Sequence, residues 1–120
     1  MSKKILLVDD AAFMRMMLKD TLTKNGYTDI VEAADGEIAC RMYAEEKPAL
    51  IIMDITMPNK TGIEALRDIK ASDPGSKIVM CSAMGQESMV VEAIKLGALD
   101  FIVKPFKPER ILQIVSKVLG

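Results

Sequence analysis

Five side chains that could do chemistry follow short apolar runs in this chain. Each run is bounded by polar or turn residues, which is typical of strands buried on both faces of a parallel sheet. The runs are Ile5-Leu6-Leu7-Val8 before Asp9-Asp10, Leu50-Ile51-Ile52-Met53 before Asp54, Ile78-Val79-Met80-Cys81 before Ser82, and Phe101-Ile102-Val103 before Lys104. Because parallel strands end at one edge of an open sheet, we expect these side chains to converge there.

The chemistry that such a group could perform involves a metal and a phosphoryl group. Three carboxylates at one edge repel one another unless a cation joins them. Oxygen ligands without histidine are typical of Mg²⁺ sites, in which one or two carboxylates share the ion with water and phosphate. A carboxylate beside Mg²⁺ can act as a nucleophile and accept a phosphoryl group. The metal, Lys104 and the Ser82 hydroxyl would then offset charge on the phosphoryl oxygens.

Each of these residues also has an ordinary structural interpretation. An aspartate between a strand and a helix is often only an N-cap, and Ser82 could cap a helix in the same way. Asp54 precedes a proline-containing turn, and Lys104 before Pro105 could be an ordinary surface lysine. Their common position at strand ends favours a functional site over a structural acidic cluster.

The elements that must position these residues follow from the apolar periodicity. Strand and helix patterns alternate five times, which indicates right-handed βαβ units, an α/β fold and a parallel sheet. The weakest strand prediction lies around Ile30-Val31. Helix boundaries are predicted at Asn25-Gly26, Asp35, Lys47-Pro48, the Thr61–Glu64 capping box, residues 87–96 and Pro108. The methionine-rich stretch 14–17 in the first helix fits packing against the sheet better than a partner site.

Length and composition limit the class of protein. The 120 residues suit one domain, predicted to span residues 1–120, with short connections and no linker. A net charge of −1, from 16 basic and 17 acidic residues, argues against a nucleic-acid partner. No apolar stretch approaches the ~18 residues of a membrane span. Cys40 and Cys81 lack metal-ligand spacing, so we expect free thiols in a reducing cytoplasm.

Four ordered motifs give the chain a family resemblance that covers residues 3–119. They are Leu7-Val8-Asp9-Asp10, Met53-Asp54-Ile55-Thr56-Met57-Pro58, Cys81-Ser82-Ala83 and Val103-Lys104-Pro105-Phe106. At this spacing the chain resembles the receiver domain of two-component response regulators, and within it the CheY-type chemotaxis regulators. The resemblance implies a flavodoxin-like (βα)5 fold, doubly wound, with five parallel strands in the order 2-1-3-4-5.

The resemblance also implies a role for each site residue. Asp54 would be phosphorylated by a histidine kinase, while Lys104 would hold the phosphoryl group and Ser82 would move to bond it. The Mg²⁺ site would consist of Asp10, Asp54 and the backbone carbonyl of Thr56, with Asp9 holding metal-bound water. The Lys104–Pro105 peptide bond is expected to be cis, which aims Lys104 into the site.

Two positions depart from the common pattern of the family. The switch aromatic is often tyrosine, whereas this chain has Phe101, which can turn inward without burying a hydroxyl. Met84 lies two residues beyond Ser82, and Thr56 lies two beyond Asp54. Polar groups at these flanking positions can orient the hydrolytic water. Met84 cannot do so, which predicts slow self-dephosphorylation.

The leading functional hypothesis is a stand-alone, monomeric phosphorylation switch that relays a signal in chemotaxis and flagellar motor control. Its expected partners are a CheA-like histidine kinase, a flagellar motor switch protein and a dedicated phosphatase, with docking over residues 86–118. Such a protein is not an enzyme beyond its own phosphotransfer and dephosphorylation. Alternatives are a single-domain receiver of another phosphorelay, an Mg²⁺-dependent phosphohydrolase, or the regulatory part of a transcription factor. The start at Met1 and the end after the last helix favour a complete protein over the last of these.

Overall fold

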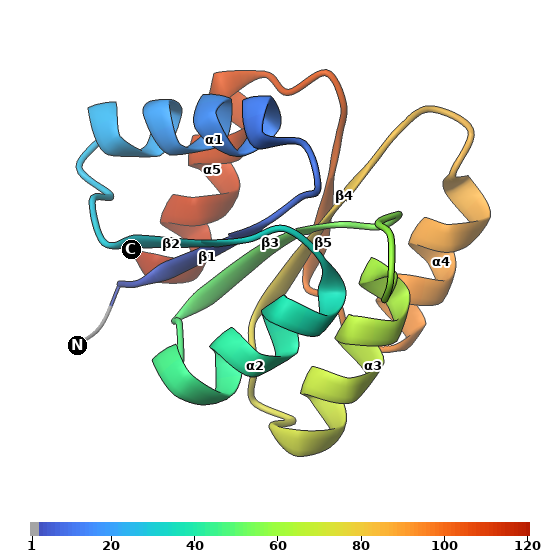
Figure 1. Cartoon of the computed structure of the whole chain (residues 1–120). Helices are drawn as coiled ribbons and strands as arrows, with labels where there is room; N and C mark the ends of the chain where they lie inside the picture. The colour runs from blue at the N-terminus through green and yellow to red at the C-terminus, as the bar shows by residue number, and fades with distance from the viewer. Residues whose placement is uncertain (1–2) are drawn as a thin grey trace.

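The computed structural model describes residues 3–120, which form a five-stranded sheet covered by helices (Figure 1). All strands run parallel in the order β2-β1-β3-β4-β5, so the predicted flavodoxin-like topology is confirmed. The strands are β1 (Ile5–Val8), β2 (Ile30–Ala33), β3 (Leu50–Asp54), β4 (Ile78–Ser82) and β5 (Asp100–Val103). The predicted domain of residues 1–120 begins at residues 1–2, which lie outside the described residues.

Helices cover both faces of the sheet and make three layers (Figure 1). One face carries α1 (Ala12–Lys24) and α5 (Pro108–Leu119), and the other carries α2 (Gly36–Glu46), α3 (Gly62–Ser72) and α4 (Glu87–Lys95). Alternate residues of a strand point to opposite faces. In β1, Leu6 and Val8 join the core under α2, α3 and α4, while Ile5 and Leu7 join the core under α1 and α5.

The three central strands β1, β3 and β4 are buried along their whole length. A strand with helices on both faces needs apolar residues at successive positions, which explains why these strands are continuous apolar runs in the sequence. The register pairs Val8 with Met53 and Asp54 with Cys81. The residues that follow β1 therefore lie beside the end of β3, and β4 flanks β3 on its other side.

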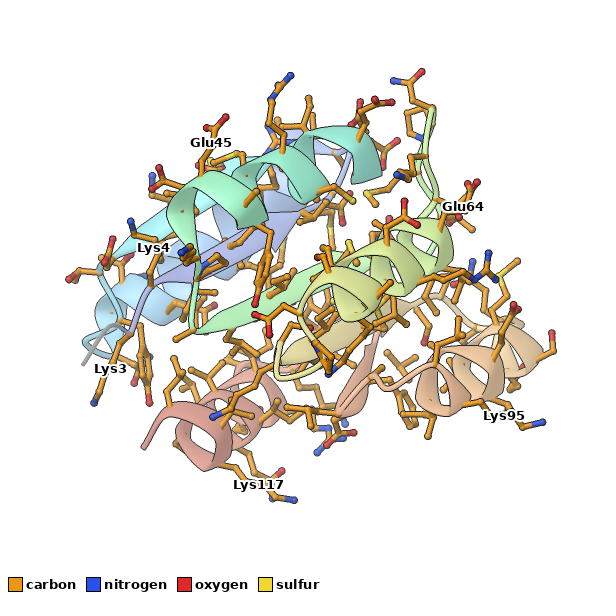
Figure 2. The ribbon with its side chains drawn as sticks, turned by 90° about the horizontal axis from the view of Figure 1, so that it is seen from below. Lys3, Lys4, Glu45, Glu64, Lys95 and Lys117 are labelled. Atoms are coloured by element: carbon orange, nitrogen blue, oxygen red, sulfur yellow. The ribbon has the colours of Figure 1, made fainter. Side chains whose placement is uncertain are left out.

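The predicted helix boundaries rest on local hydrogen bonds. At the start of α2, the Asp35 side chain accepts a hydrogen bond from the backbone N–H of Ile38 at 2.9 Å. At the start of α3, the Thr61 hydroxyl and the Glu64 carboxylate each cap the other's backbone N–H, so the predicted capping box is confirmed. Figure 2 shows Glu64 on the outer side of that helix.

A close approach at Gly62 holds the loop after β3 against the strand. A Cβ atom at Gly62 would lie 2.0 Å from the backbone carbonyl oxygen of Asp54, so a larger residue does not fit. The Gly62 N–H also donates to the carbonyl of Ile55 at 2.8 Å. The loop that carries Thr56 is thus fixed relative to Asp54.

Asp54 and Ser82 are the last residues of β3 and β4, at the strand ends where they were predicted. The structure corrects one sequence-based expectation. The methionine-rich stretch of α1 does not pack uniformly on the core, because the side chains of Met16 and Met17 are 58% and 40% exposed. A single buried stripe that includes Leu18 is enough to dock α1 on the sheet.

Within residues 3–120, no helix combines the length and the apolar character that a membrane span needs.

Candidate functional site

The structure brings the three predicted aspartates together at the carboxyl edge of the sheet. One potential ligand oxygen from each of Asp9, Asp10 and Asp54 lies within 4.8 Å of the others. Asp9 and Asp54 are only 2% and 6% exposed, whereas Asp10 faces solvent. The cluster is therefore a partly buried group of like charges that opens to water on one side.

Lys104 is the cation that faces this cluster. Its ammonium lies 3.0 Å from a carboxylate oxygen of Asp9 and 3.2 Å from one of Asp54. The other carboxylate oxygen of Asp9 accepts a hydrogen bond from the backbone N–H of Ala11 at 2.9 Å. Asp9 is thus fixed from two sides, and Lys104 bridges the ends of β1 and β3.

Backbone hydrogen bonds set the position of Lys104 and of Ser82. The Lys104 N–H donates to the carbonyl of Ser82 at 2.8 Å, which ties the end of β5 to the end of β4. The Lys104–Pro105 peptide bond is cis, as predicted. Ser82 is only 2% exposed and lies one residue beyond Cys81, the strand partner of Asp54. The hydroxyl predicted to meet a phosphoryl group is therefore on the strand next to Asp54.

The electrostatics of the site favour the binding of positive charge. Burial and the neighbouring charges of Asp9 and Asp10 raise the pKa of Asp54, although the Lys104 ammonium opposes that shift. Burial works against the charged form of Lys104, yet its contacts with Asp9 and Asp54 outweigh burial and raise its pKa. One lysine thus neutralises only part of the negative charge of the three carboxylates, and a divalent cation would relieve the remaining repulsion.

The donor set fits a hard metal ion. It consists of carboxylate oxygens within 4.8 Å of one another, one of them open to solvent, which suits an ion that retains water. Of the residues predicted to ligate the ion, Thr56 lies on the exposed loop after β3 that Gly62 holds against the strand. The acidic cluster could therefore hold a metal together with a backbone oxygen of that loop.

The remaining predicted residues lie around the edge of the site. Phe101 is half-buried on β5 and lines both an apolar groove of about 620 Å³ beside α4 and a smaller hollow of about 360 Å³ on its other side. Met84 is 86% exposed and lines the same groove and hollow as Phe101.

Sequence reasoning missed Gln86 as a residue of the site. Its side-chain oxygen accepts a hydrogen bond from the N–H of Ala83 at 2.7 Å, and its side-chain nitrogen lies 3.4 Å from the Thr56 hydroxyl. Gln86 thereby links the loops that follow β3 and β4. Its position as the N-cap of α4, four residues after Ser82, was the available signal.

Comparison with known proteins agrees with this geometry. A family model described as the response regulator receiver domain matches residues 5–116. The chain belongs to the response regulator receiver domain family. Members of such a family are signalling proteins rather than classical enzymes.

The chain is similar to chemotaxis proteins along nearly its whole length. It is 57% identical to a chemotaxis protein CheY of Thermotoga maritima over 118 residues, which cover 98% of each chain. It is 56% identical to a chemotaxis protein CheY of Bacillus subtilis over 120 residues, which cover 100% of each chain. Among solved structures, the receiver domain of NtrX from Brucella abortus matches with a TM-score of 0.91 and 32% identity, covering 96% of this chain and 97% of that one.

Proposed function

We propose that this chain is a phosphorylation switch in which Asp54 accepts a phosphoryl group from a histidine kinase. The observation that carries the proposal is the position of Asp54, which is buried beside two further carboxylates and a lysine at the end of the central strand. In the transfer, the bond between phosphorus and the histidine nitrogen breaks and the nitrogen keeps the electron pair. A bond forms between phosphorus and a carboxylate oxygen of Asp54.

Mg²⁺ is the metal that we propose for the acidic cluster. The carboxylates of Asp10 and Asp54 and the backbone carbonyl of Thr56 would hold it, while Asp9 would bind water on the ion. When bound, the ion neutralises charge on the phosphoryl oxygens and orients them for transfer. The incomplete compensation of the carboxylates by Lys104 supports this assignment, because the site gains from additional positive charge.

Lys104 and Ser82 would complete the site around the phosphoryl group. The Lys104 ammonium already lies 3.2 Å from Asp54, so it can contact a phosphoryl oxygen on that carboxylate with little movement. Ser82 would donate its hydroxyl to another phosphoryl oxygen. Because the phosphoryl group brings close to two negative charges, both contacts strengthen when the group is attached.

The signal would leave the molecule through Phe101 and the surface of α4, β5 and α5. Phe101 has space on both of its sides, in the groove beside α4 and in the hollow that Pro105 lines. Inward movement of Ser82 would vacate room next to β4, and an inward turn of Phe101 would fill it. We propose that this turn changes the shape of the groove and that an output partner docks there when Asp54 is phosphorylated.

Chemotaxis is the process that the relatives favour. A CheA-like histidine kinase would supply the phosphoryl group, a flagellar motor switch protein would bind the phosphorylated form, and a dedicated phosphatase would end the signal. A single domain over residues 1–120, a monomeric state and a cytoplasmic location belong to the same proposal. Its support is the similarity along the whole chain to chemotaxis regulators of two organisms.

A reconstitution with purified proteins tests the function. The chain is incubated with a CheA-like kinase, ATP and Mg²⁺, and its affinity for a flagellar motor switch protein is measured by titration. We expect phosphorylation to increase the affinity at least tenfold, or about 1.4 kcal/mol. We expect no increase for Asp54→Asn. Equal affinities of the phosphorylated and unphosphorylated chains would contradict the proposed output.

A further inference from the structure

Gln86 was not among the predicted site residues, yet its side chain joins two loops that border the site. An N–H group can only donate, so the atom of Gln86 that lies 2.7 Å from the Ala83 nitrogen must be the amide oxygen. This fixes the orientation of the amide and directs its NH₂ group toward the Thr56 hydroxyl at 3.4 Å. One side chain therefore connects the start of α4 to the loops after β3 and β4.

The Ala83 N–H is the donor that matters in this arrangement. It follows Ser82 directly, at the carboxyl end of the strand that neighbours β3, and therefore lies at the edge where Asp54 ends its strand. A backbone N–H at this edge can donate a hydrogen bond to an anionic oxygen. In the unphosphorylated chain that N–H is already bonded to Gln86.

The loop that Gln86 closes is otherwise exposed. Ala83, Met84 and Gly85 all face solvent, and Gly85 adopts a φ of +88° with open space around the position of a Cβ atom. Ser82, in contrast, is buried and anchored through its carbonyl to Lys104. The bond to Gln86 thus spans the segment between a fixed strand end and the first turn of α4.

We propose that Gln86 is a latch that holds the unphosphorylated state by occupying the Ala83 N–H. The proposal rests on the proposed function, because a phosphoryl oxygen on Asp54 is the acceptor that competes with Gln86 for this N–H. The stronger, charged acceptor displaces the neutral amide oxygen. Released Gln86 also leaves Thr56, so the N-terminus of α4 loses its link to both loops.

The latch gives α4 a direct connection to the phosphorylation site. Gln86 is the N-cap residue of α4, and Val90, Val91 and Ile94 of that helix line the same apolar groove as Phe101. When Gln86 is displaced, the first turn of α4 becomes free to shift and the wall of the groove moves with it. The latch would therefore act in addition to the turn of Phe101.

The test removes both hydrogen-bonding groups of Gln86 and keeps the size of the side chain. Gln86→Met and wild type are incubated with limiting acetyl phosphate and Mg²⁺, and the initial rate of phosphorylation is followed by the mass of the intact protein. Acetate leaves as the phosphoryl group joins Asp54. In most wild-type molecules the Ala83 N–H is bonded to Gln86 and cannot bind the incoming phosphoryl oxygen. We therefore expect Gln86→Met to be phosphorylated about three- to tenfold faster, which is the population ratio that corresponds to one hydrogen bond.

A purely structural role for Gln86 predicts no increase in the rate of phosphorylation. Loss of a supporting hydrogen bond would lower the melting temperature and leave phosphorylation equal or slower, whereas a latch makes the variant less stable and faster. Gln113→Met is the matched control, because Gln113 is exposed and lies on α5, outside the two loops that Gln86 joins. The rate of this variant should equal that of wild type.

A second measurement on wild type keeps the latch testable if Gln86→Met does not fold. The NMR signals of the Ala83 N–H and the Gln86 side-chain NH₂ should both shift when Asp54 is phosphorylated. Two results would overturn the latch and leave the proposed function standing. One is that the Gln86 signals do not change when Asp54 is phosphorylated. The other is that Gln86→Met and wild type both take up the phosphoryl group, at the same initial rate. Wild type that takes up no phosphoryl group overturns the proposed function and the latch together.

Discussion

Replacement of Lys104 by methionine should destabilise the metal-free protein strongly and in a pH-dependent way. Methionine keeps an unbranched side chain but removes the ammonium that lies 3.0 Å from Asp9 and 3.2 Å from Asp54. At an effective dielectric constant of about 20, each contact corresponds to about 5 kcal/mol of Coulomb attraction before the cost of desolvating the lysine. Removing one partner of a buried ion pair typically costs about 3–5 kcal/mol.

Protonation of Asp54 sets an upper limit on this loss. Burial and its acidic neighbours already raise the pKa of Asp54, and without Lys104 that pKa rises further. Protonation of a carboxyl costs about 1.4 kcal/mol for each pH unit above its unfolded pKa, which is about 3.9 for aspartate. At pH 7 this cost is therefore about 4 kcal/mol. We therefore expect the variant to lose about 3–4 kcal/mol of the free energy of unfolding at pH 7.

The sign of the pH dependence follows from the direction of the shift. A carboxyl whose folded pKa is raised binds its proton preferentially in the folded state, so stability falls as pH rises through that pKa. The deficit of Lys104→Met relative to wild type should therefore be smaller at about pH 5 than at about pH 7. Acid should thus partly rescue the variant.

The assay is urea unfolding in the presence of EDTA, followed by far-ultraviolet circular dichroism at both pH values. Lys117→Met is the control, because Lys117 projects from α5 into solvent (Figure 2). The double variant Lys104→Met/Asp54→Asn should regain part of the lost stability, since it removes one of the two buried carboxylates that lose their cation. A loss no larger than that of Lys117→Met, or a deficit independent of pH, would refute the proposed charge balance of the site.

Three further predictions follow from other parts of the structure. Asp10→Asn should raise the melting temperature of the metal-free protein by about 2–5 °C and weaken Mg²⁺ binding, because it relieves repulsion within the cluster; a lower melting temperature in EDTA would favour a structural role. Phe101→Ala should leave phosphorylation near normal but reduce the phosphorylation-dependent gain in partner affinity about tenfold, and an undiminished gain would exclude the aromatic ring as the relay. Burial and a hydrogen bond to Asp73 raise the pKa of Tyr43 from 10.0 to about 12. The difference in the free energy of unfolding between wild type and Tyr43→Phe should therefore be largest below about pH 10 and disappear as pH rises through about 12. Urea titrations on both sides of that range measure this difference, and a pH-independent difference would count against the shift.

The sheet and the carboxyl edge were predictable because they depend on short-range signals. The continuous apolar runs of β1, β3 and β4 identify strands with helices on both faces, and each run ends beside a polar side chain. Capping residues such as Asp35 and Thr61 marked helix starts through bonds to backbone three residues away. The convergence of Asp9 with Asp54 depended in addition on the strand order 2-1-3-4-5, which came from the family resemblance and makes β1 the neighbour of β3.

The parts that escaped prediction depend on where a side chain points in three dimensions. Met14 to Met17 fit a helix, but the periodicity could not show that Leu18 and Leu22 are the buried residues of α1 while Met16 is exposed. Gln86 looked like an ordinary helix-start residue, because its contact with Thr56 spans 30 positions of sequence. Likewise, the place of Met84 on the wall of the apolar groove depends on the conformation of its loop.

The most direct measurement identifies the residue that carries the phosphoryl group. The chain is phosphorylated with kinase or acetyl phosphate in the presence of Mg²⁺, reduced with borohydride to convert an aspartyl phosphate to homoserine, and digested for mass spectrometry. We predict homoserine at position 54 alone, dependent on Mg²⁺ and absent when EDTA is added before the donor. Homoserine at Asp9 or Asp10 at equal yield, or its appearance in Asp54→Asn, would contradict the assignment of Asp54 as the acceptor.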